Sequence, residues 1–317
     1  MSEEKLFLHQ HKIFAALVSQ IARSLEIYPY LVEKDYWLMH CLWALQQQGW
    51  KFELKGGTSL SKAYGIIDRF SEDIDIRFEP PAELDLKTGK NHDKPAHIAA
   101  RKEFFDHLAT QISIPDLIEV KRDADYDDDK YRNGGILLDY HSVIKQLPGV
   151  KEGILLEIGF DVTSPNSPRT ISSWALDAAF KAKVDVFDNR AVDVACYSPA
   201  YTFVEKLQTV STKFRKQQEA FSFPKNFLRH YYDIYRLLGN EEVLAFIGTP
   251  EYVAHKQARF PKADNQHIAT NEAFLLSDPK VRSLYDAKYR ETAALYYKGQ
   301  IPFGEIIKRI HQHIEQL

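Results

Sequence analysis

Two cysteines, Cys41 and Cys196, are all that the 317-residue sequence contains, which excludes the disulfide frameworks of small secreted domains. No CxxC pair is present, so the sequence offers no thiolate zinc site. Long hydrophobic runs are missing too, because stretches such as residues 37–45 carry His40 and fall short of the ~20 apolar residues that span a membrane. Residues 1–12 lack the basic-then-apolar order of a signal peptide. We therefore expect a cytoplasmic protein with no membrane partner.

A large net charge is also absent, since 41 Lys and Arg side chains oppose 44 Asp and Glu side chains and leave −3. This balance excludes a uniformly basic nucleic-acid coat protein, but it allows a local basic surface. Residues 201–317 hold 17 basic and 13 acidic side chains, whereas residues 1–200 are acidic overall. With 44% hydrophobic and 13% aromatic residues, the chain can bury a sizeable core.

The pattern of the sequence changes at about residue 199. Before this point helical and strand patterns alternate, and after it the chain is almost entirely helical in pattern. We predict two domains, a mixed α/β domain at 1–198 and a helical domain at 199–317. Residues 80–97 and the stretch around Pro165, Asn166 and Pro168 predict loops. Strands are predicted at 51–55, 73–78, 136–141, 154–161, 182–187 and 191–196, and helices at 6–24, 31–48, 58–64, 98–112, 200–219, 225–239, 241–247, 272–276 and 302–316.

The first motif with chemical content is KGGTSLSK at residues 55–62. The pair Gly56 and Gly57 lies between a predicted strand and a predicted helix, where glycine lets the backbone approach a phosphate group closely. The hydroxyl groups of neighbouring residues add hydrogen-bond donors, and nearby basic side chains add positive charge. We therefore predict a nucleotide phosphate site made of Gly56, Gly57, Thr58, Ser59, Lys62 and Arg69.

A pair of carboxylates follows this motif. Asp73 and Asp75 are two residues apart on a predicted strand, so both side chains leave the same face. In residues 154–161 the alternation places Glu157 on the polar face of another strand, next to Gly159. Carboxylate oxygens suit Mg²⁺, which keeps substrate phosphates as its remaining ligands. A metal site at Asp73, Asp75 and Glu157 beside a phosphate loop predicts nucleotidyl transfer.

Each feature also has a simpler interpretation. Alone, a glycine pair before a helix is usually a tight turn, and a DxD pattern is usually a solvent-facing edge. Glu157 could be an ordinary acid on a half-exposed strand. Further along the chain, Asp233 lies four residues after Arg229 and three before Arg236, a spacing that fits helix ion pairs. The order of the first two motifs, within 20 residues of each other, favours the functional interpretation of those two.

The KGGTSLSK segment and RFSEDID at residues 69–75 resemble the motifs of the AbiEii/AbiGii-type nucleotidyltransferase toxins, a branch of the DNA polymerase β-like superfamily. EKDY at 33–36, FVEKL at 203–207 and RHYYDIY at 229–235 resemble further family segments. These matches fall in order between residues of about 30 and 238. Residues after about 240 match nothing that we can assign.

The resemblance implies a fold and roles for particular residues. It implies an α+β nucleotidyltransferase fold, with a mixed sheet flanked by helices and a helical carboxy-terminal half. Ser71, Asp73 and Asp75 match the catalytic S-x-D-x-D centre, with both aspartates on the metal. Lys206 and Asp233 match residues that such enzymes use at the nucleotide site.

The resemblance also implies an activity. We expect an enzyme that uses Mg²⁺, or Mn²⁺ in its place, to move a nucleoside monophosphate from an NTP to a hydroxyl group and to release pyrophosphate. The implied acceptor is a tRNA 3′ end, the implied role is that of a toxin in a toxin–antitoxin or phage-defence system, and the implied partner is an antitoxin. Two alternatives stay open: transfer to a protein hydroxyl, as in AMPylation, including the enzyme's own Ser71, and a non-catalytic nucleotide-binding module.

Overall fold

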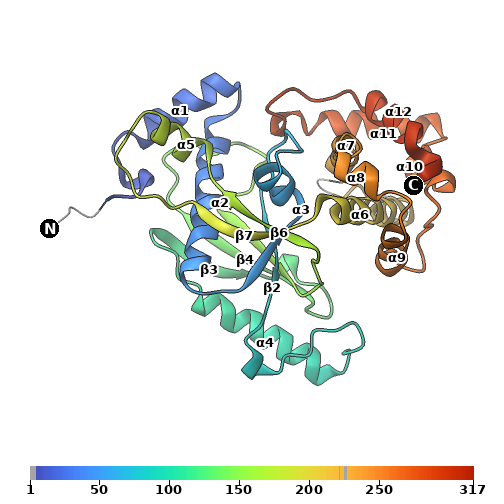
Figure 1. Ribbon diagram of the computed structural model, residues 1–317, viewed down its shortest axis with the longest axis horizontal. Helices are drawn as coiled ribbons and strands as arrows, with labels where there is room; N and C mark the ends of the chain where they lie inside the picture. Colours follow the sequence, from blue (N-terminus) through green and yellow to red (C-terminus); the bar gives the residue numbers. More distant parts are fainter. Residues whose placement is uncertain (1–4, 221, 225–226) are drawn as a thin grey trace. The chain divides into compact units, whose positions relative to one another are not determined.

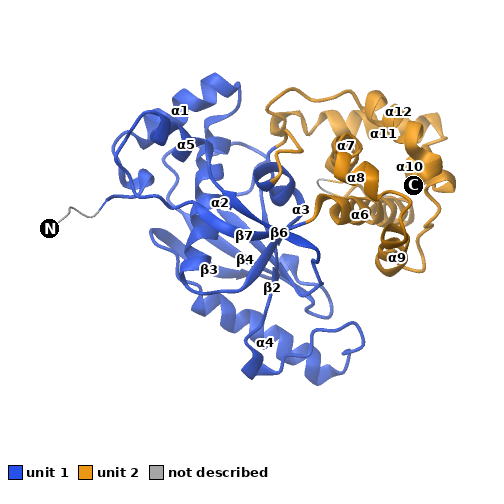
Figure 2. Cartoon of the chain, viewed as in Figure 1, with its two compact units in different colours: residues 1–63, 70–197 blue, residues 64–69, 198–317 orange. Residues whose placement is uncertain are grey.

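The computed structural model describes residues 5–220, 222–224 and 227–317 (Figure 1). The chain forms two compact units, one made of residues 1–63 and 70–197 and the other of residues 64–69 and 198–317 (Figure 2). The second unit begins within one residue of the predicted boundary. The segment 64–69 differs from that prediction, because it leaves the first unit between the glycine motif and Asp73 and belongs to the second.

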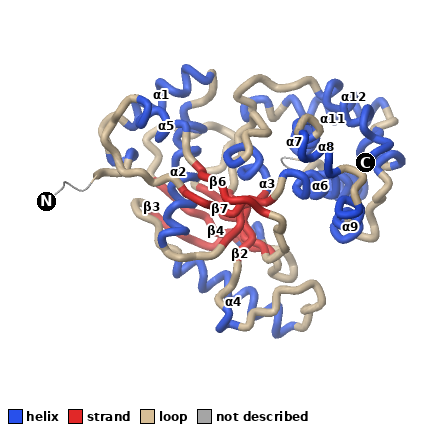
Figure 3. Tube along the Cα trace, viewed as in Figure 1, coloured by secondary structure: helices blue, strands red, loops and turns tan. Residues whose placement is uncertain are grey.

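The first unit contains a seven-stranded sheet with the order β3-β4-β5-β2-β1-β7-β6. The sheet is mixed, since β2 pairs with β5 and β1 pairs with β7 in parallel, whereas the other neighbours are antiparallel. All seven strands belong to this unit (Figure 3). They are β1 Phe52–Lys55, β2 Ile74–Phe78, β3 Leu117–Asp123, β4 Asn133–Tyr140, β5 Ile154–Gly159, β6 Asn166–Ile171 and β7 Ala191–Tyr197.

Alternation along the central strands separates the two faces of the sheet. Leu54, Ile76 and Ile158 are fully or almost fully buried on one face, and side chains such as Asp75 and Glu157 leave the other face. The helix α2, Pro29–Gln47, contacts β5 and β7 and is buried along most of its length. Helices α1, Phe14–Leu25, and α5, Trp174–Lys181, pack on α2, which explains why α2 is buried on nearly all sides.

Three elements of the first unit were not predicted. β6 contains Pro168 and lies at an edge of the sheet, where a missing N–H is tolerated, so the loop predicted there is wrong. β3 lies at the opposite edge, is partly exposed and has a charged sequence. The helix α5 is capped by Ser173, whose side chain accepts a hydrogen bond from Leu176 N. The strand predicted at 182–187 is also wrong, because these residues follow α5 without regular strand structure.

The second unit is helical. Its α6, Pro199–Ala220, contacts α7, Arg229–Leu237, which in turn contacts α12, Phe303–His313. The predicted helix at 225–239 includes residues 225 and 226, which lie outside the described part, and the observed helix begins at Arg229. The other α-helices of this unit, within the described residues, are α8 Glu241–Phe246, α9 Pro250–Arg259, α10 Glu272–Leu275 and α11 Pro279–Arg290, of which α9 and α11 were not predicted.

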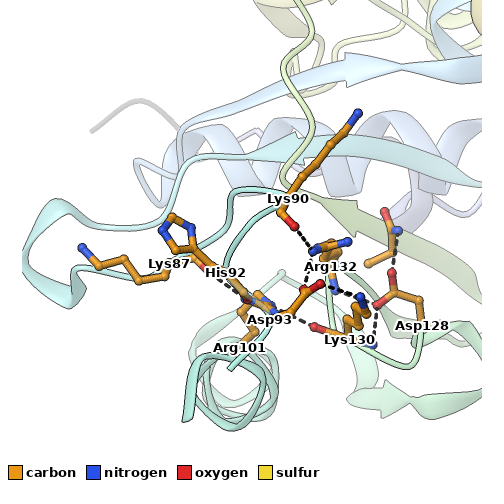
Figure 4. A network of polar contacts seen from close by, with 9 residues as sticks. Lys87, Lys90, His92, Asp93, Arg101, Asp128, Lys130 and Arg132 are labelled. Carbon is orange, nitrogen blue, oxygen red and sulfur yellow. Dashed lines mark hydrogen bonds and ion pairs between the residues drawn. The ribbon is translucent and has the colours of Figure 1, made fainter. Parts of the chain in front are cut away.

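In the first unit, a buried arginine holds the long segment before α4, Pro95–Gln111. Arg101 is fully buried and donates hydrogen bonds to the carbonyl oxygens of Lys87, His92 and Lys130 at 2.6, 3.0 and 2.9 Å (Figure 4). Asp93 pairs with the Lys130 ammonium group at 2.5 Å. The predicted loop at 80–97 is therefore fixed by polar contacts to the backbone.

No helix of the described residues is long and apolar enough to cross a membrane.

Candidate active site

The glycine motif and the second aspartate lie against each other in the first unit. β1 and β2 pair so that Lys55 is opposite Asp75, and the short helix α3, Gly56–Thr58, begins at the next residue. Gly56 has a φ of +70°, and a Cβ built there would lie 2.2 Å from Asp75 Oδ2. Both the backbone conformation and the close approach require glycine. The helix therefore begins at the glycine pair, earlier than the predicted start at residue 58.

The three predicted metal ligands also lie together. The parallel pairing of β2 with β5 places Asp75 opposite Glu157, and partners in such a register share a face. Asp73 comes directly before β2. Burial raises the pKa of the Glu157 carboxyl, and the charges of Asp75 and Asp73 raise it further. Crowded carboxylates of this kind favour either a shared proton or a bound cation.

The oxygen donors of this carboxylate cluster (Asp73, Asp75 and Glu157) suit a hard cation such as Mg²⁺. Within the described residues, however, no group of three or more His, Cys, Asp or Glu side chains is arranged so that it could hold a metal ion. Magnesium in nucleotide enzymes commonly takes only one or two carboxylates and completes its shell with water and substrate phosphates. The donor set therefore fits magnesium chemically, and the metal site stays a prediction.

Thr58 connects the two motifs. Its hydroxyl group donates a 2.5 Å hydrogen bond to the carbonyl oxygen of Asp73, and both Thr58 and Ser59 are fully buried. The hydroxyl proton of Thr58 is therefore used inside the protein, so this hydroxyl group is not available to donate to a phosphate. Binding of phosphate by Gly56, Gly57, Thr58 and Ser59 stays a prediction.

Lys62 is held by a buried acid. Its ammonium group lies 2.8 Å from Asp35 Oδ1 and 5.1 Å from the centre of the Trp174 ring. Asp35 also accepts a hydrogen bond from Trp174 N at 2.9 Å. Lys62 therefore connects the turn after α3 to α2 and α5, and its predicted contact with the nucleotide would compete with this pair.

The other three predicted residues meet in the second unit. Arg69 donates two hydrogen bonds of 2.7 Å to the two carboxylate oxygens of Asp233, and Lys206 Nζ lies 2.9 Å from Asp233 Oδ2. Burial opposes ionisation of Asp233, but Arg69 and Lys206 outweigh it and hold the pKa of Asp233 at about 2. The close partners of Asp233 thus come from residue 69 and from α6, and its helix neighbour Arg236 pairs with Asp68 instead.

The segment 64–69 is positioned by main-chain contacts within the second unit. Arg69 forms an isolated β-bridge with Tyr296, and Tyr297 N donates to the Asp68 carbonyl oxygen at 3.2 Å. The Tyr232 hydroxyl accepts a hydrogen bond from Asp68 N at 3.1 Å. These contacts fix the backbone from which the Arg69 side chain reaches Asp233.

Comparison with known proteins bears directly on this arrangement. A family model described as nucleotidyl transferase AbiEii toxin, type IV toxin–antitoxin system, matches residues 37–309. The chain belongs to the AbiEii family. It is therefore a nucleotidyltransferase, as the motifs predicted, and membership in a type IV toxin–antitoxin family implies a nucleotide substrate and an antitoxin partner. The match also extends through residues 240–309, where we recognised no motif.

Other comparisons add little to the AbiEii assignment. No curated protein matches the sequence. Among solved structures, an antigenic nucleotidyltransferase-like protein from Paracoccidioides brasiliensis is similar over 72% of this chain and 94% of that chain, with 12% sequence identity and a TM-score of 0.34. A likeness this loose carries no residue-level argument, and the family model alone decides the assignment.

In this AbiEii-family enzyme, Lys34 of the EKDY segment lies near the carboxylates of Glu72 and Asp73. Lys34 is fully buried and donates a 2.6 Å hydrogen bond to the Lys151 carbonyl oxygen. Burial lowers the pKa of Lys34 to about 8, although the charges of Glu72 and Asp73 act in the opposite direction. Lys34 thus supplies a buried cation near the segment that contains Glu72 and Asp73. The only sequence signal for Lys34 was the EKDY resemblance. The predicted catalytic residue Ser71 is half-buried and lies two residues before Asp73.

Proposed function

We propose that this AbiEii-family enzyme transfers a nucleoside monophosphate from an NTP to the 3′-terminal hydroxyl of tRNA, with Mg²⁺, or Mn²⁺, held by Asp73, Asp75 and Glu157. The observation that supports this most is the carboxylate cluster itself. Asp75 lies against the backbone of Gly56, and Glu157 is its partner on the next strand. A cluster whose charges repel each other gains most from a bound cation.

In this reaction the acceptor hydroxyl oxygen forms a bond to the α-phosphorus and loses its proton to solvent. The bond from that phosphorus to the pyrophosphate oxygen breaks, and pyrophosphate leaves with the electron pair of that bond. When bound, the metal would stabilise charge on the phosphate oxygens and lower the pKa of the acceptor hydroxyl. Gly56 and Gly57 bring main-chain N–H groups to the edge of the carboxylates, where a phosphate would bind. Lys34 offsets part of the negative charge of the aspartate segment.

The role of the Arg69–Asp233–Lys206 cluster follows from its charge. Two cations share one fully buried carboxylate, so the cluster carries a net positive charge. Positive charge stabilises the triphosphate of a substrate and the charge on departing pyrophosphate. We propose that Lys206 contributes to binding of the nucleotide phosphates and that Asp233 fixes the position of its ammonium group.

The test is transfer of label from each α-³²P-NTP to total tRNA in the presence of Mg²⁺ or Mn²⁺. Wild type should label tRNA, and Asp73→Ala should not. Glu119→Gln is the matched control, because Glu119 is an exposed acid on an edge strand of the same sheet, and it should label tRNA as wild type does. Transfer by Asp73→Ala at the wild-type rate would refute the site.

The same assay distinguishes the alternative functions. Label on protein and not on RNA would assign the acceptor to a protein hydroxyl, and loss of that label in Ser71→Ala would identify Ser71. Binding of NTP without transfer to either acceptor, and with equal affinity with and without Mg²⁺, would favour a binding module. Growth arrest on expression of wild type, absent with Asp73→Ala, would support the role as a toxin, and survival of phage-infected cultures would test the defence role.

A further inference from the structure

A groove of about 690 Å³ lies in the second unit and is lined by residues of α11 and α12. These two helices contact each other (Figure 1). The exposed residues of the lining include Arg282 and Ser283 from α11 and Gly304, Lys308 and Gln312 from α12. None of the residues to which we assign the metal or the nucleotide phosphates lines this groove. It is therefore a surface that the proposed reaction does not yet use.

The groove carries a positive charge. Arg282 donates a hydrogen bond of 3.1 Å to the uncharged carbonyl oxygen of Leu275, and within the described residues neither Arg282 nor Lys308 forms an ion pair. Asp286, the acid in the lining, is paired with Arg290 at 2.7 Å. Four Lys and Arg side chains in α11 and two in α12 stand against one acidic side chain in each helix. The groove is therefore complementary to an anionic partner.

Gly304 leaves open space at this groove. It is the second residue of α12 and is exposed, and a Cβ built there would have nothing within 4 Å. Packing within the described part of the chain therefore does not require glycine, which is a poorer helix former than alanine. A glycine in such a position suits a partner whose backbone comes close to the helix.

The apolar lining of the groove favours nucleic acid over protein as this partner. Phe303 and Ile307 line the groove but are only 1% and 3% exposed, so an amphipathic helix would find little apolar surface to bury. Helices that bind in grooves depend on such burial. Contacts with a nucleic-acid backbone come instead from Arg and Lys and from polar side chains such as Ser and Gln, which are the residue types exposed in this groove.

We propose that the groove between α11 and α12 binds the sugar–phosphate backbone of RNA. In this arrangement Arg282 and Lys308 donate hydrogen bonds to phosphate oxygens and supply charge. Ser283 and Gln312 donate to phosphate or ribose oxygens, and the space at Gly304 admits the RNA backbone. The choice of RNA as the polyanion rests on the proposed function, in which tRNA is the acceptor. Backbone contacts carry no base specificity, so the groove positions the RNA and does not select its sequence.

The test is binding of a fluorescein-labelled tRNA to the full chain, followed by anisotropy at KCl concentrations from about 50 to 200 mM with EDTA present. Arg282→Ala and Lys308→Ala should each lower the magnitude of the slope of log K against log salt by roughly 0.7–0.9, the value for one phosphate contact. Lys280→Ala is the matched control, because Lys280 is an exposed lysine of α11 outside the lining of the groove, and it should keep the wild-type slope. Wild-type slopes in both groove variants would overturn the proposal.

A further variant blocks the groove without a change in charge. Gly304→Gln places a side chain in the open space and should raise the Kd for tRNA. Glutamine is a better helix former than glycine, so thermal unfolding followed by circular dichroism should show no loss of stability, which separates the loss of binding from misfolding. A folded Gly304→Gln variant that binds tRNA with wild-type affinity would also overturn the proposal.

Failure of the proposed function gives a different result. If wild type transfers no nucleotide to tRNA but the Arg282 and Lys308 variants lower the salt slope of tRNA binding, the groove stands and the acceptor in the proposed function is wrong. If wild type labels tRNA and both variants bind tRNA as wild type does, the groove is wrong.

Calorimetry with two other anions tests the remaining ligands. Pyrophosphate represents free phosphates, and a poly-glutamate peptide represents an acidic protein segment. Smaller effects of Arg282→Ala and Lys308→Ala on these two anions than on tRNA support the RNA assignment. An effect on either anion as large as the effect on tRNA would assign the groove to that class of ligand and overturn the proposal.

Discussion

Replacement of Gly56 by alanine tests two reasons for glycine at this position, the positive φ of the backbone and the close approach to Asp75. A residue with a side chain at φ +70° costs about 1–2 kcal/mol in folding free energy relative to glycine. In addition, the new Cβ would lie 2.2 Å from Asp75 Oδ2, 2.9 Å from its Cγ and 3.1 Å from its Cβ. Rotation of the carboxylate alone cannot relieve contacts with the inner atoms, so the Asp75 side chain must shift by roughly 1 Å to regain ordinary packing.

The expected result is a large loss of activity beside a moderate loss of stability. Misplacement of a reacting group by about 1 Å lowers the rate by roughly 100-fold, and we expect Gly56→Ala to reduce single-turnover transfer to that extent. Gly49→Ala is the matched control, because Gly49 has a φ of +78° in the same unit but has nothing within 4 Å of its added Cβ. Urea unfolding should show the backbone penalty in both variants and a further loss from the contact with Asp75 in Gly56→Ala, and only Gly56→Ala should lose transfer. Equal activities would refute the idea that Asp75 needs the space at Gly56.

Further predictions concern three ionisable residues, Asp233, Glu157 and Arg101. Asp233→Asn should lower the free energy of unfolding by about 3–5 kcal/mol, because Arg69 and Lys206 would keep their buried charges without a carboxylate; chemical denaturation measures this, and a loss below 1 kcal/mol would contradict it. In wild type the folded-state pKa of Asp233 is about 2, below the ordinary value of 3.8, so its stabilisation is present above pH 4 and is lost as the pH falls from about 4 to 2. Acid unfolding followed by circular dichroism should therefore show a shallower decline in this window for Asp233→Asn. Glu157→Gln should remove one of the proposed Mg²⁺ ligands and weaken Mg²⁺-dependent thermal stabilisation in the presence of NTP. Scanning calorimetry would detect this effect, and an unchanged Mg²⁺ response would exclude it. Arg101→Met should lower the free energy of unfolding by about 2–3 kcal/mol, since three backbone carbonyls lose a charged donor, and protease cleavage within residues 85–94 should accelerate; unchanged cleavage would show that other contacts hold the segment.

Local sequence patterns were sufficient to predict that the carboxylates and the glycine motif lie together. Alternation in residues 154–161 predicted that Glu157 leaves the polar face, and the observed register places it beside Asp75. The glycine pair predicted a close backbone approach, which Gly56 makes to Asp75. These features depend on residues near each other in sequence or on strand periodicity, both of which a single sequence contains. The catalytic roles of these residues remain predictions.

Long-range pairing could not be predicted from the same patterns. Arg69 and Asp233 are 164 residues apart, and no periodicity links a loop arginine to a particular helix. The spacing of α7 instead favoured local ion pairs for Asp233 and gave no indication of its close partners Arg69 and Lys206. Similarly, the glycine motif predicted that Lys62 binds phosphate, but it could not predict the ion pair of Lys62 with Asp35. Asp35 lies on a helix that the motif does not include. Pro168 can lie in a strand because β6 is at an edge of the sheet. The position of a strand at an edge depends on the whole sheet and not on the local sequence.

The crossing of residues 64–69 into the second unit has a consequence during protein synthesis. Arg69 leaves the ribosome 164 residues before the carboxylate that it binds, Asp233. At bacterial or eukaryotic elongation speeds of about 5–20 residues per second, this delay is roughly 8–33 s. Through that interval the nascent chain has the glycine motif and both aspartates of the catalytic segment but has neither Lys206 nor Asp233 for most of the time. A toxin built in this order gains Lys206 and Asp233, to which we assign the nucleotide phosphates only as a proposal, when most of its chain has been made, so prematurely terminated chains would be released without them.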